Sequence, residues 1–171
     1  MFTEKFNTPY TAAPFRQIQL DDYVPAFDQT IAQARAEVEA IITNPEAPTF
    51  ENTIEALEFS GQALDRLSSI FFNLNSAETN DTMQQIAQEV SPKLTAFGND
   101  IALNETLFQR VKTVYDQRET LSLSPEQLML LEKKYKGFSR NGALLSEEKK
   151  NRLREIDTDL AKLKLTFGEN V

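Results

Sequence analysis

Residues 124–138 read SPEQLMLLEKKYKGF, and this stretch predicts the kind of fold. Ser124 precedes a proline, and Gln127 stands at the third helical position. This is the pattern of a helix N-terminus, because the serine and glutamine side chains pair with free backbone N–H groups and proline fits the first turn. The apolar residues then recur at every third or fourth position: Leu128, Leu131, Tyr135 and Phe138. The stretch therefore predicts an amphipathic helix with one buried face.

The same spacing recurs on both sides of this stretch. It predicts further helices over residues 21–43, 49–71, 81–101, 104–119 and 146–168. We expect Gly61 to allow a close helix contact, Pro92 to kink its helix, and residues 73–80 to form a turn. No strand-like alternation is found. The predicted class is all-α, with about six amphipathic helices in an antiparallel helical bundle and no sheet.

The apolar stripes of these helices are interpreted as core, since such stripes are far more often buried than exposed. The last one has a 3-4-3-4 spacing and consists of Leu153, Ile156, Leu160, Leu163 and Phe167. The alternative, that a stripe lines a groove for a partner, is kept open for residues 70–75, which are denser in apolar side chains than one stripe needs.

Residues 1–20 differ from the rest, because they contain two prolines and show no helical period. They predict an extended arm that packs through its aromatics, which are Phe2, Phe6, Tyr10 and Phe15. Residues 21–171 then form the helical domain. A chain of 171 residues suits one domain with a single core.

The charge and the apolar pattern disfavour two classes of partner. The net charge is -8, and an acidic surface repels nucleic acid and anionic lipid. No stretch has the roughly 18 apolar residues of a membrane span, and the N-terminus does not have the pattern of a signal peptide. We therefore expect no nucleic acid and no membrane as partners. A chain without cysteine agrees with a reducing compartment, so a cytoplasmic protein is expected.

Histidine and cysteine are both absent. This excludes a Ser-His-Asp triad, a Cys-His dyad and an HExxH zinc helix within the chain. Gly137 and Gly142 have the outer spacing of a phosphate loop but lack the Lys-Ser/Thr that must follow. The pairs Asp21/Asp22 and Glu147/Glu148 lie at helix starts, where capping explains them. We predict no catalytic residue, no cofactor-binding residue and no metal ligand.

The basic clusters are interpreted as solvated faces, because nearby glutamates dilute them. They comprise Lys133, Lys134 and Lys136, and Lys149, Lys150, Arg152 and Arg154.

Several segments together resemble a known family. They are residues 14–15, 21–27, 44–54, 58–61, 71–77, 79–81, 99–101, 103–104, 107–111, 140–143 and 167–171. In this combination they are similar to the N-terminal region of the thimet-oligopeptidase-like zinc metallopeptidases. Within the family the likeness is greatest to the bacterial peptidyl-dipeptidase (dipeptidyl carboxypeptidase) branch, with oligopeptidase A next. The likeness extends over nearly the whole chain.

The resemblance implies a function that this chain does not perform alone. Family members place HExxH and a downstream glutamate in a C-terminal catalytic half, where a zinc-bound water attacks the peptide bond. Their N-terminal helices form a wall of a channel that admits short peptides. None of the catalytic motif maps here, so zinc belongs to the full-length parent only. The expected partners are the parent's catalytic half and, in the whole enzyme, short peptides.

Two hypotheses therefore stand. The first is a non-catalytic N-terminal segment of a zinc enzyme that releases C-terminal dipeptides, with a chain that continues past Val171. The alternative is a stand-alone acidic all-α module that binds another protein.

Overall fold

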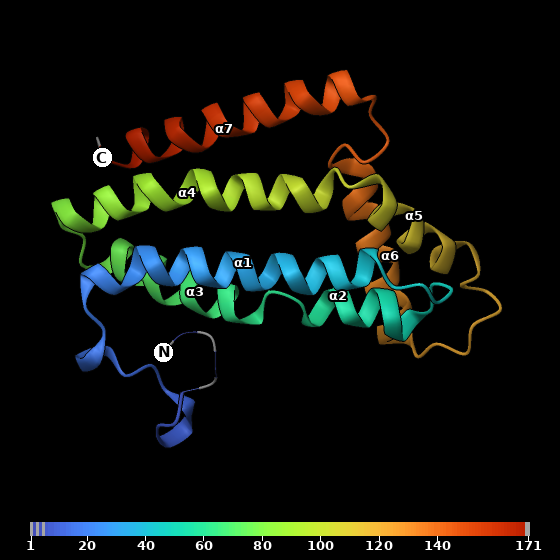
Figure 1. The fold of residues 1–171 in the computed structure, drawn as a ribbon, viewed down its shortest axis with the longest axis horizontal. Coiled ribbons are helices and arrows are strands. Elements are labelled where there is room, and N and C mark those ends of the chain that lie inside the picture. The colour runs from blue at the N-terminus through green and yellow to red at the C-terminus, as the bar shows by residue number, and fades with distance from the viewer. Residues whose placement is uncertain (1, 3, 5, 170–171) are drawn as a thin grey trace. The chain divides into compact units, whose positions relative to one another are not determined.

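The structure is a computed structural model that describes residues 2, 4 and 6–169. It confirms the all-α class, and no residue in these ranges lies in a strand. The helices are α1 (Tyr23–Ile42), α2 (Ala56–Phe59), α3 (Gln62–Ala77), α4 (Asp81–Ala102), α5 (Glu105–Asp116), α6 (Pro125–Arg140) and α7 (Glu147–Glu169) (Figure 1). Short 3-10 turns cover Pro9–Thr11, Phe15–Gln17 and Leu20–Asp22, and a π-helical turn, η4, covers Phe50–Glu55.

The chain divides into two compact units. Unit 1 comprises Met1–Ala36, Gly61–Thr95 and Thr158–Val171, and unit 2 comprises Glu37–Ser60 and Ala96–Asp157. Helices α1, α4 and α7 each contain residues of both units. A helix of about 20 residues is about 30 Å long, as long as a small domain is wide, so its two ends can contribute to different cores.

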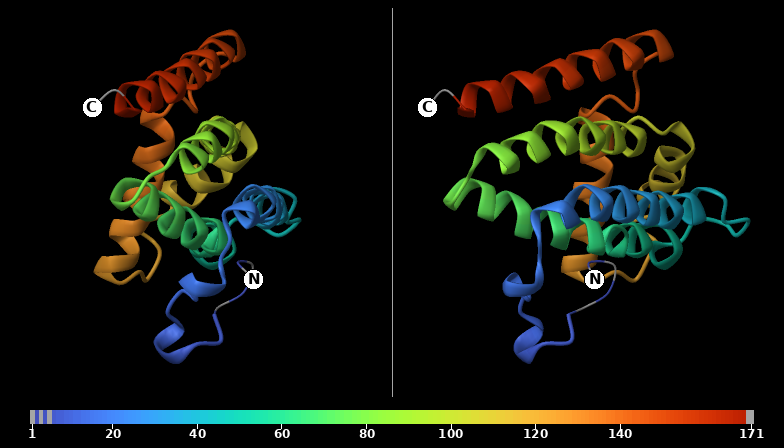
Figure 2. Two further views of the ribbon diagram at one scale, coloured as in Figure 1. Left: turned by 90° about the vertical axis from the view of Figure 1, so that its left-hand side faces the viewer. Right: turned by 60° about the vertical axis from the view of Figure 1, so that its left-hand side comes forward.

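In unit 1, the start of α1 packs against α3 through aromatic rings. The ring of Phe71 lies 4.9 Å from that of Tyr23 and 5.6 Å from that of Phe27. At the other end of α3, a Cβ placed on Gly61 would lie 3.9 Å from the Cβ of Ala34. The two helices therefore run antiparallel, as Figures 1 and 2 show, and α1 lies beside Gly61 at an ordinary van der Waals distance that would also admit a Cβ.

The sequence predicts one continuous helix over residues 49–71, and this prediction is wrong. The segment consists of η4, α2 and α3, with a break at Ser60 and Gly61. Gly61 has a φ of 75°, a left-handed conformation that glycine adopts without strain. This conformational freedom, rather than the missing side chain alone, explains why the helix breaks there.

The turn predicted over residues 73–80 is wrong in its first half, because α3 continues to Ala77. The polar side chains lie on the exposed or half-buried side of the helix, and the Asn73 side chain donates a 2.6 Å hydrogen bond to the carbonyl of Ser69. Pro92 lies inside α4, which continues to Ala102, and the expected kink there stays a prediction. Val90, two residues earlier, is fully buried, and such packing can override local propensity.

In unit 2, α5, α6 and η4 surround a mainly aliphatic core. Its members are Val38, Ile41, Phe50, Ile54, Leu57, Leu107, Phe108, Val111, Val114, Leu131, Phe138 and Ala143. The predicted cap of α6 is confirmed: the Ser124 hydroxyl accepts from the Gln127 N–H at 3.3 Å, and the Gln127 side chain accepts from the Ser124 N–H at 2.9 Å. Local capping thus sets where α6 begins.

The N-terminal segment is less extended than expected, because it contains three 3-10 turns. Phe2 and Phe6 are buried, whereas Tyr10 and Phe15 are exposed. Packing through aromatics is therefore confirmed for the first two rings and wrong for the other two. No helix within the described residues is long and apolar enough to cross a membrane.

Candidate functional site

The described residues offer no metal centre. They contain no group of three or more carboxylates placed to hold an ion. The whole sequence also lacks the imidazole and thiolate ligands that zinc prefers. Zinc therefore does not fit this part of the molecule, and no chemical step can be derived through it here.

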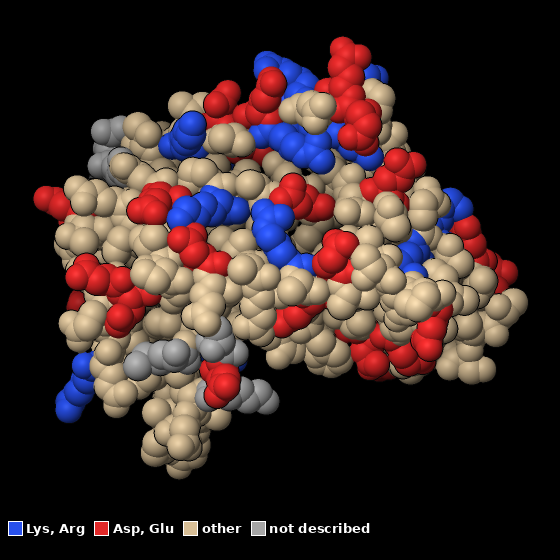
Figure 3. Space-filling model, in the orientation of Figure 1, with Lys and Arg blue, Asp and Glu red and all other residues tan. Residues whose placement is uncertain are grey.

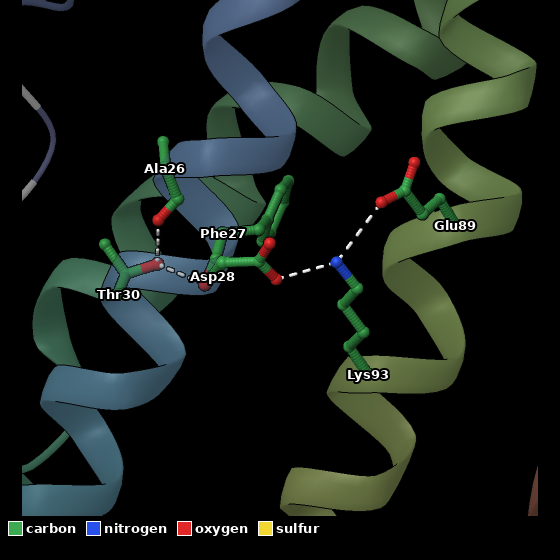
Figure 4. Close-up of polar contacts among 6 residues, drawn as sticks. All are labelled: Ala26, Phe27, Asp28, Thr30, Glu89 and Lys93. Atoms are coloured by element: carbon green, nitrogen blue, oxygen red, sulfur yellow. Dashed lines mark hydrogen bonds and ion pairs between the residues drawn. The ribbon is translucent and has the colours of Figure 1, made fainter.

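In unit 1, one cation joins α1 to α4 (Figure 4). The Lys93 ammonium lies 2.7 Å from the Asp28 carboxylate and 3.2 Å from that of Glu89. The hydrogen bond to Asp28 is the main cause that raises the pKa of Lys93, and Glu89 adds to it against the opposing effect of desolvation. A lysine with a raised pKa stays charged and does not act as a general base, so this cluster is a tie between helices.

In unit 2, a buried arginine organises the segment between α1 and η4. Arg110 of α5 is 9% exposed. Its guanidinium donates to the carbonyls of Asn44 at 2.9 Å and Glu46 at 3.3 Å, and to the side-chain oxygen of Asn52 at 3.3 Å. Charge-assisted hydrogen bonds of this kind are stronger than neutral ones. Arg110 therefore fixes the course of residues 44–46.

Asn52 is the second residue that shapes this segment. Its side-chain oxygen accepts from the Thr49 N–H and the Thr53 hydroxyl, both at 2.8 Å, and its amide donates to the Ala47 carbonyl at 2.9 Å. Residues 44–54 and 107–111, two of the segments that carry the family resemblance, are thereby joined by hydrogen bonds. These contacts hold the two segments together.

Sequence reasoning missed Arg110. A signal was available, because Arg110 lies three residues after Leu107 and four before Val114, on the apolar side of α5, where a charged side chain needs buried partners. What the sequence does not contain is the identity of those partners, which lie about 60 residues earlier in the chain.

The basic clusters are only partly solvated. Lys150 is 2% exposed and lies 2.9 Å from the Glu147 carboxylate, so the prediction is wrong for this residue. The hydrogen bond from Lys150 lowers the pKa of Glu147. Other members make surface pairs, such as Lys134 with Glu58 at 2.8 Å and Arg152 with Glu155 at 2.7 Å. Figure 3 shows that blue and red side chains are mixed on the visible face.

Two hollows lie in the surface of unit 2. One, of about 450 Å³, is lined by residues that include Asn99, Ser139, Arg140 and Asp157. The other, of about 410 Å³, is lined by residues that include Glu37, Asn44, Phe59 and Ser60. The hydroxyls of Ser139 and Ser60 donate to the carbonyls of Tyr135 and Leu57 in the preceding helical turn. Neither serine is thus paired with a base as a nucleophile would be.

The last apolar stripe is largely uncovered, and its interpretation as core is wrong. Leu160 is 45% exposed, Leu163 is 66% exposed and Phe167 is 73% exposed, and Ile156, one turn earlier, is 45% exposed. We call Leu160, Leu163 and Phe167, which belong to unit 1, the α7 stripe. The helix is amphipathic as predicted, but its most apolar side faces solvent.

Comparison with known proteins confirms the resemblance that the motifs indicated. The chain is homologous to the N-terminal region of the thimet-oligopeptidase-like proteins. It is 43% identical to the dipeptidyl carboxypeptidase of Salmonella typhimurium over 163 residues, which is 95% of this chain and 24% of that protein. The dipeptidyl carboxypeptidase of Escherichia coli is 41% identical over 99% of the chain, and the oligopeptidase A of Salmonella typhimurium is 25% identical over 99%.

The chain spans about a quarter of the length of these curated relatives. No family model matches it. The identity is higher to the dipeptidyl carboxypeptidases than to the oligopeptidase A proteins, in the order that the sequence motifs predict.

Proposed function

We propose that this chain is the non-catalytic N-terminal helical region of a zinc-dependent peptidyl-dipeptidase-like oligopeptidase. In the longer enzyme it forms a wall of the channel through which short peptides reach the catalytic half, and C-terminal dipeptides are released there. The observation that carries the proposal is the match of 95–99% of the chain to a quarter of two dipeptidyl carboxypeptidases.

The chemistry of the residues supports a structural contribution. Without histidine or cysteine, the chain has no ligand set for a catalytic zinc. The terminal guanidinium nitrogens of Arg110 and the ammonium of Lys150 bind partners within the fold. We therefore assign zinc and the catalytic residues to the part of the longer protein outside this quarter. The division into an arm at 1–20 and a helical domain at 21–171, and the cytoplasmic location, stay predictions.

A cleavage assay tests the proposal. The protein encoded by the complete reading frame and the 171-residue chain are each incubated with zinc and an N-terminally blocked tripeptide. We expect the longer protein to release the C-terminal dipeptide and to lose this activity with a chelator, and the chain alone to release none. Dipeptide release by the purified chain, or a longer protein without metal-dependent cleavage, would contradict the proposal.

The alternative is a stand-alone acidic module that binds another protein, and the exposed α7 stripe is the observation that favours it. The reading frame separates the two. A frame that continues to an HExxH motif supports the enzyme region, whereas a stop codon directly after Val171 supports the module.

A further inference from the structure

Helix α7 has two apolar sides in unit 1. Successive residues of an α-helix are turned by about 100°, so the α7 stripe lies on one side and Ala161 and Leu165 lie on the other. Ala161 and Leu165 are half-buried, whereas the three stripe residues are exposed. The inner side therefore already packs on the fold, and the outer side has no covering element among the described residues.

The exposed side is built like the centre of an interface. Leu160, Leu163 and Phe167 are all large and apolar, and they follow one another along successive turns. Asp159 and Lys164, which are exposed, flank them. An apolar centre with a charged rim is typical of a surface that another protein segment covers. A single exposed leucine needs no explanation, but an aligned row of three does.

We infer that the α7 stripe is the surface on which the downstream part of the longer enzyme packs. This inference rests on the proposed function. The relatives are about four times as long as the matched region, so most of their chain is available to cover it. A segment of the same polypeptide also binds at a high effective concentration, which favours it over a second copy or a separate protein.

The absence of cysteine in this region allows a direct test. Leu163→Cys and, separately, Leu160→Cys are introduced into the complete protein, and the rate of maleimide labelling of that cysteine is followed by peptide mass spectrometry. Lys149→Cys is the matched control, because Lys149 is an exposed residue on the same helix. Each rate is divided by the rate of the same variant in denaturant.

We expect the stripe cysteines to react at least about tenfold more slowly than the control, because a covered thiol reacts only when the contact opens. Equal rates at the stripe and control positions in the monomeric protein would overturn the inference. Protection that appears only with rising protein concentration, together with a dimer mass in light scattering, would overturn it in favour of a second copy. Leu160→Cys keeps the test valid where Leu163→Cys fails to fold.

The cleavage assay separates this inference from the proposed function. If the complete protein cleaves the tripeptide but its stripe cysteines react as fast as the control, the proposed function is supported and the packing inference is wrong. If the stripe cysteines are protected but the complete protein does not cleave the tripeptide, the packing inference is supported and the proposed enzymatic function is wrong.

Discussion

The two compact units of this chain are stabilised in different ways. Unit 1 packs the rings of Tyr23, Phe27 and Phe71 against one another, and its tie between α1 and α4 lies at the surface. Unit 2 has a mainly aliphatic core, and a buried arginine holds its loop. Apolar ring contacts dominate in the first arrangement, whereas the second also depends on the partly buried hydrogen bonds of Arg110. Substitutions that remove one kind of contact should therefore act on different units.

The largest effect is expected in unit 1, from Phe71→Ala. Phe71 is fully buried and contacts three other rings, so the substitution removes apolar contacts and leaves a cavity. We expect the free energy of unfolding to fall by about 3–5 kcal/mol. Urea denaturation measures this change. Hydrogen exchange should increase first in residues 23–36 and 62–77.

Phe59→Ala is the matched control, since Phe59 is 61% exposed and its loss should change the stability by less than about 0.5 kcal/mol. Equal losses for the two variants would mean that the aromatic cluster does not hold unit 1 together. If hydrogen exchange increases equally in both units, the two units unfold together. The stability of unit 1 could then not be distinguished from that of unit 2.

The second effect concerns Arg110→Met in unit 2. Methionine keeps much of the apolar volume but removes the donor from the carbonyls of Asn44 and Glu46, whereas the side-chain oxygen of Asn52 keeps its bonds from Thr49 and Thr53. We expect a loss of about 2–3 kcal/mol, because hydrogen bonds to a charged group are lost. Hydrogen exchange should increase in residues 43–60 before it does in α3.

Arg152→Met serves as the control for Arg110→Met. Arg152 is exposed and pairs with Glu155 on the same helix, and such surface pairs contribute less than about 1 kcal/mol. An Arg110 variant as stable as the Arg152 variant would contradict the view that unit 2 depends on its buried polar contacts.

The difference between local contacts and tertiary contacts explains which features could be predicted from the sequence. The caps at Ser124, Asn104 and Thr49 depend on residues three positions apart, so the sequence is sufficient to find them. The break at Gly61 was not predicted, because an isolated glycine fits a helix contact and a left-handed turn equally well. Burial of Arg110 and Lys150 depends on the tertiary structure and could not be found from spacing.

The α7 stripe illustrates a further limit of sequence patterns. The 3-4 spacing predicts correctly that one side of the helix is apolar, but it does not contain the identity of the covering surface. In unit 1 that side is exposed, although shorter stripes such as the one in α5 are buried as expected. Periodicity thus predicts helices and their apolar sides well, and the site that we propose here required the structure.

The smallest effect tests the surface tie of unit 1. Lys93→Met removes the pairs with Asp28 and Glu89, and because the Lys93 side chain is 35% exposed we expect a loss below about 1 kcal/mol near neutral pH. The pKa of Lys93 is raised in the folded state, mainly by the hydrogen bond to Asp28. Its contribution is therefore complete below the unfolded pKa of about 10.4 and is lost as the pH rises through the folded value.

The stability difference between the wild type and Lys93→Met should accordingly be constant from neutral pH to about pH 9 and should decrease as the pH rises beyond the unfolded pKa of about 10.4. Urea midpoints at several pH values measure it. Tyr23, whose pKa is raised by burial and by Asp22, also destabilises the fold at alkaline pH, but it is present in both proteins and cancels in the difference. Lys136→Met, which removes a surface pair within α6, is the control. A difference that persists undiminished to about pH 12 would show that the Lys93 side chain stabilises unit 1 by packing rather than by charge, and the surface tie would then resemble the apolar contacts around Phe71.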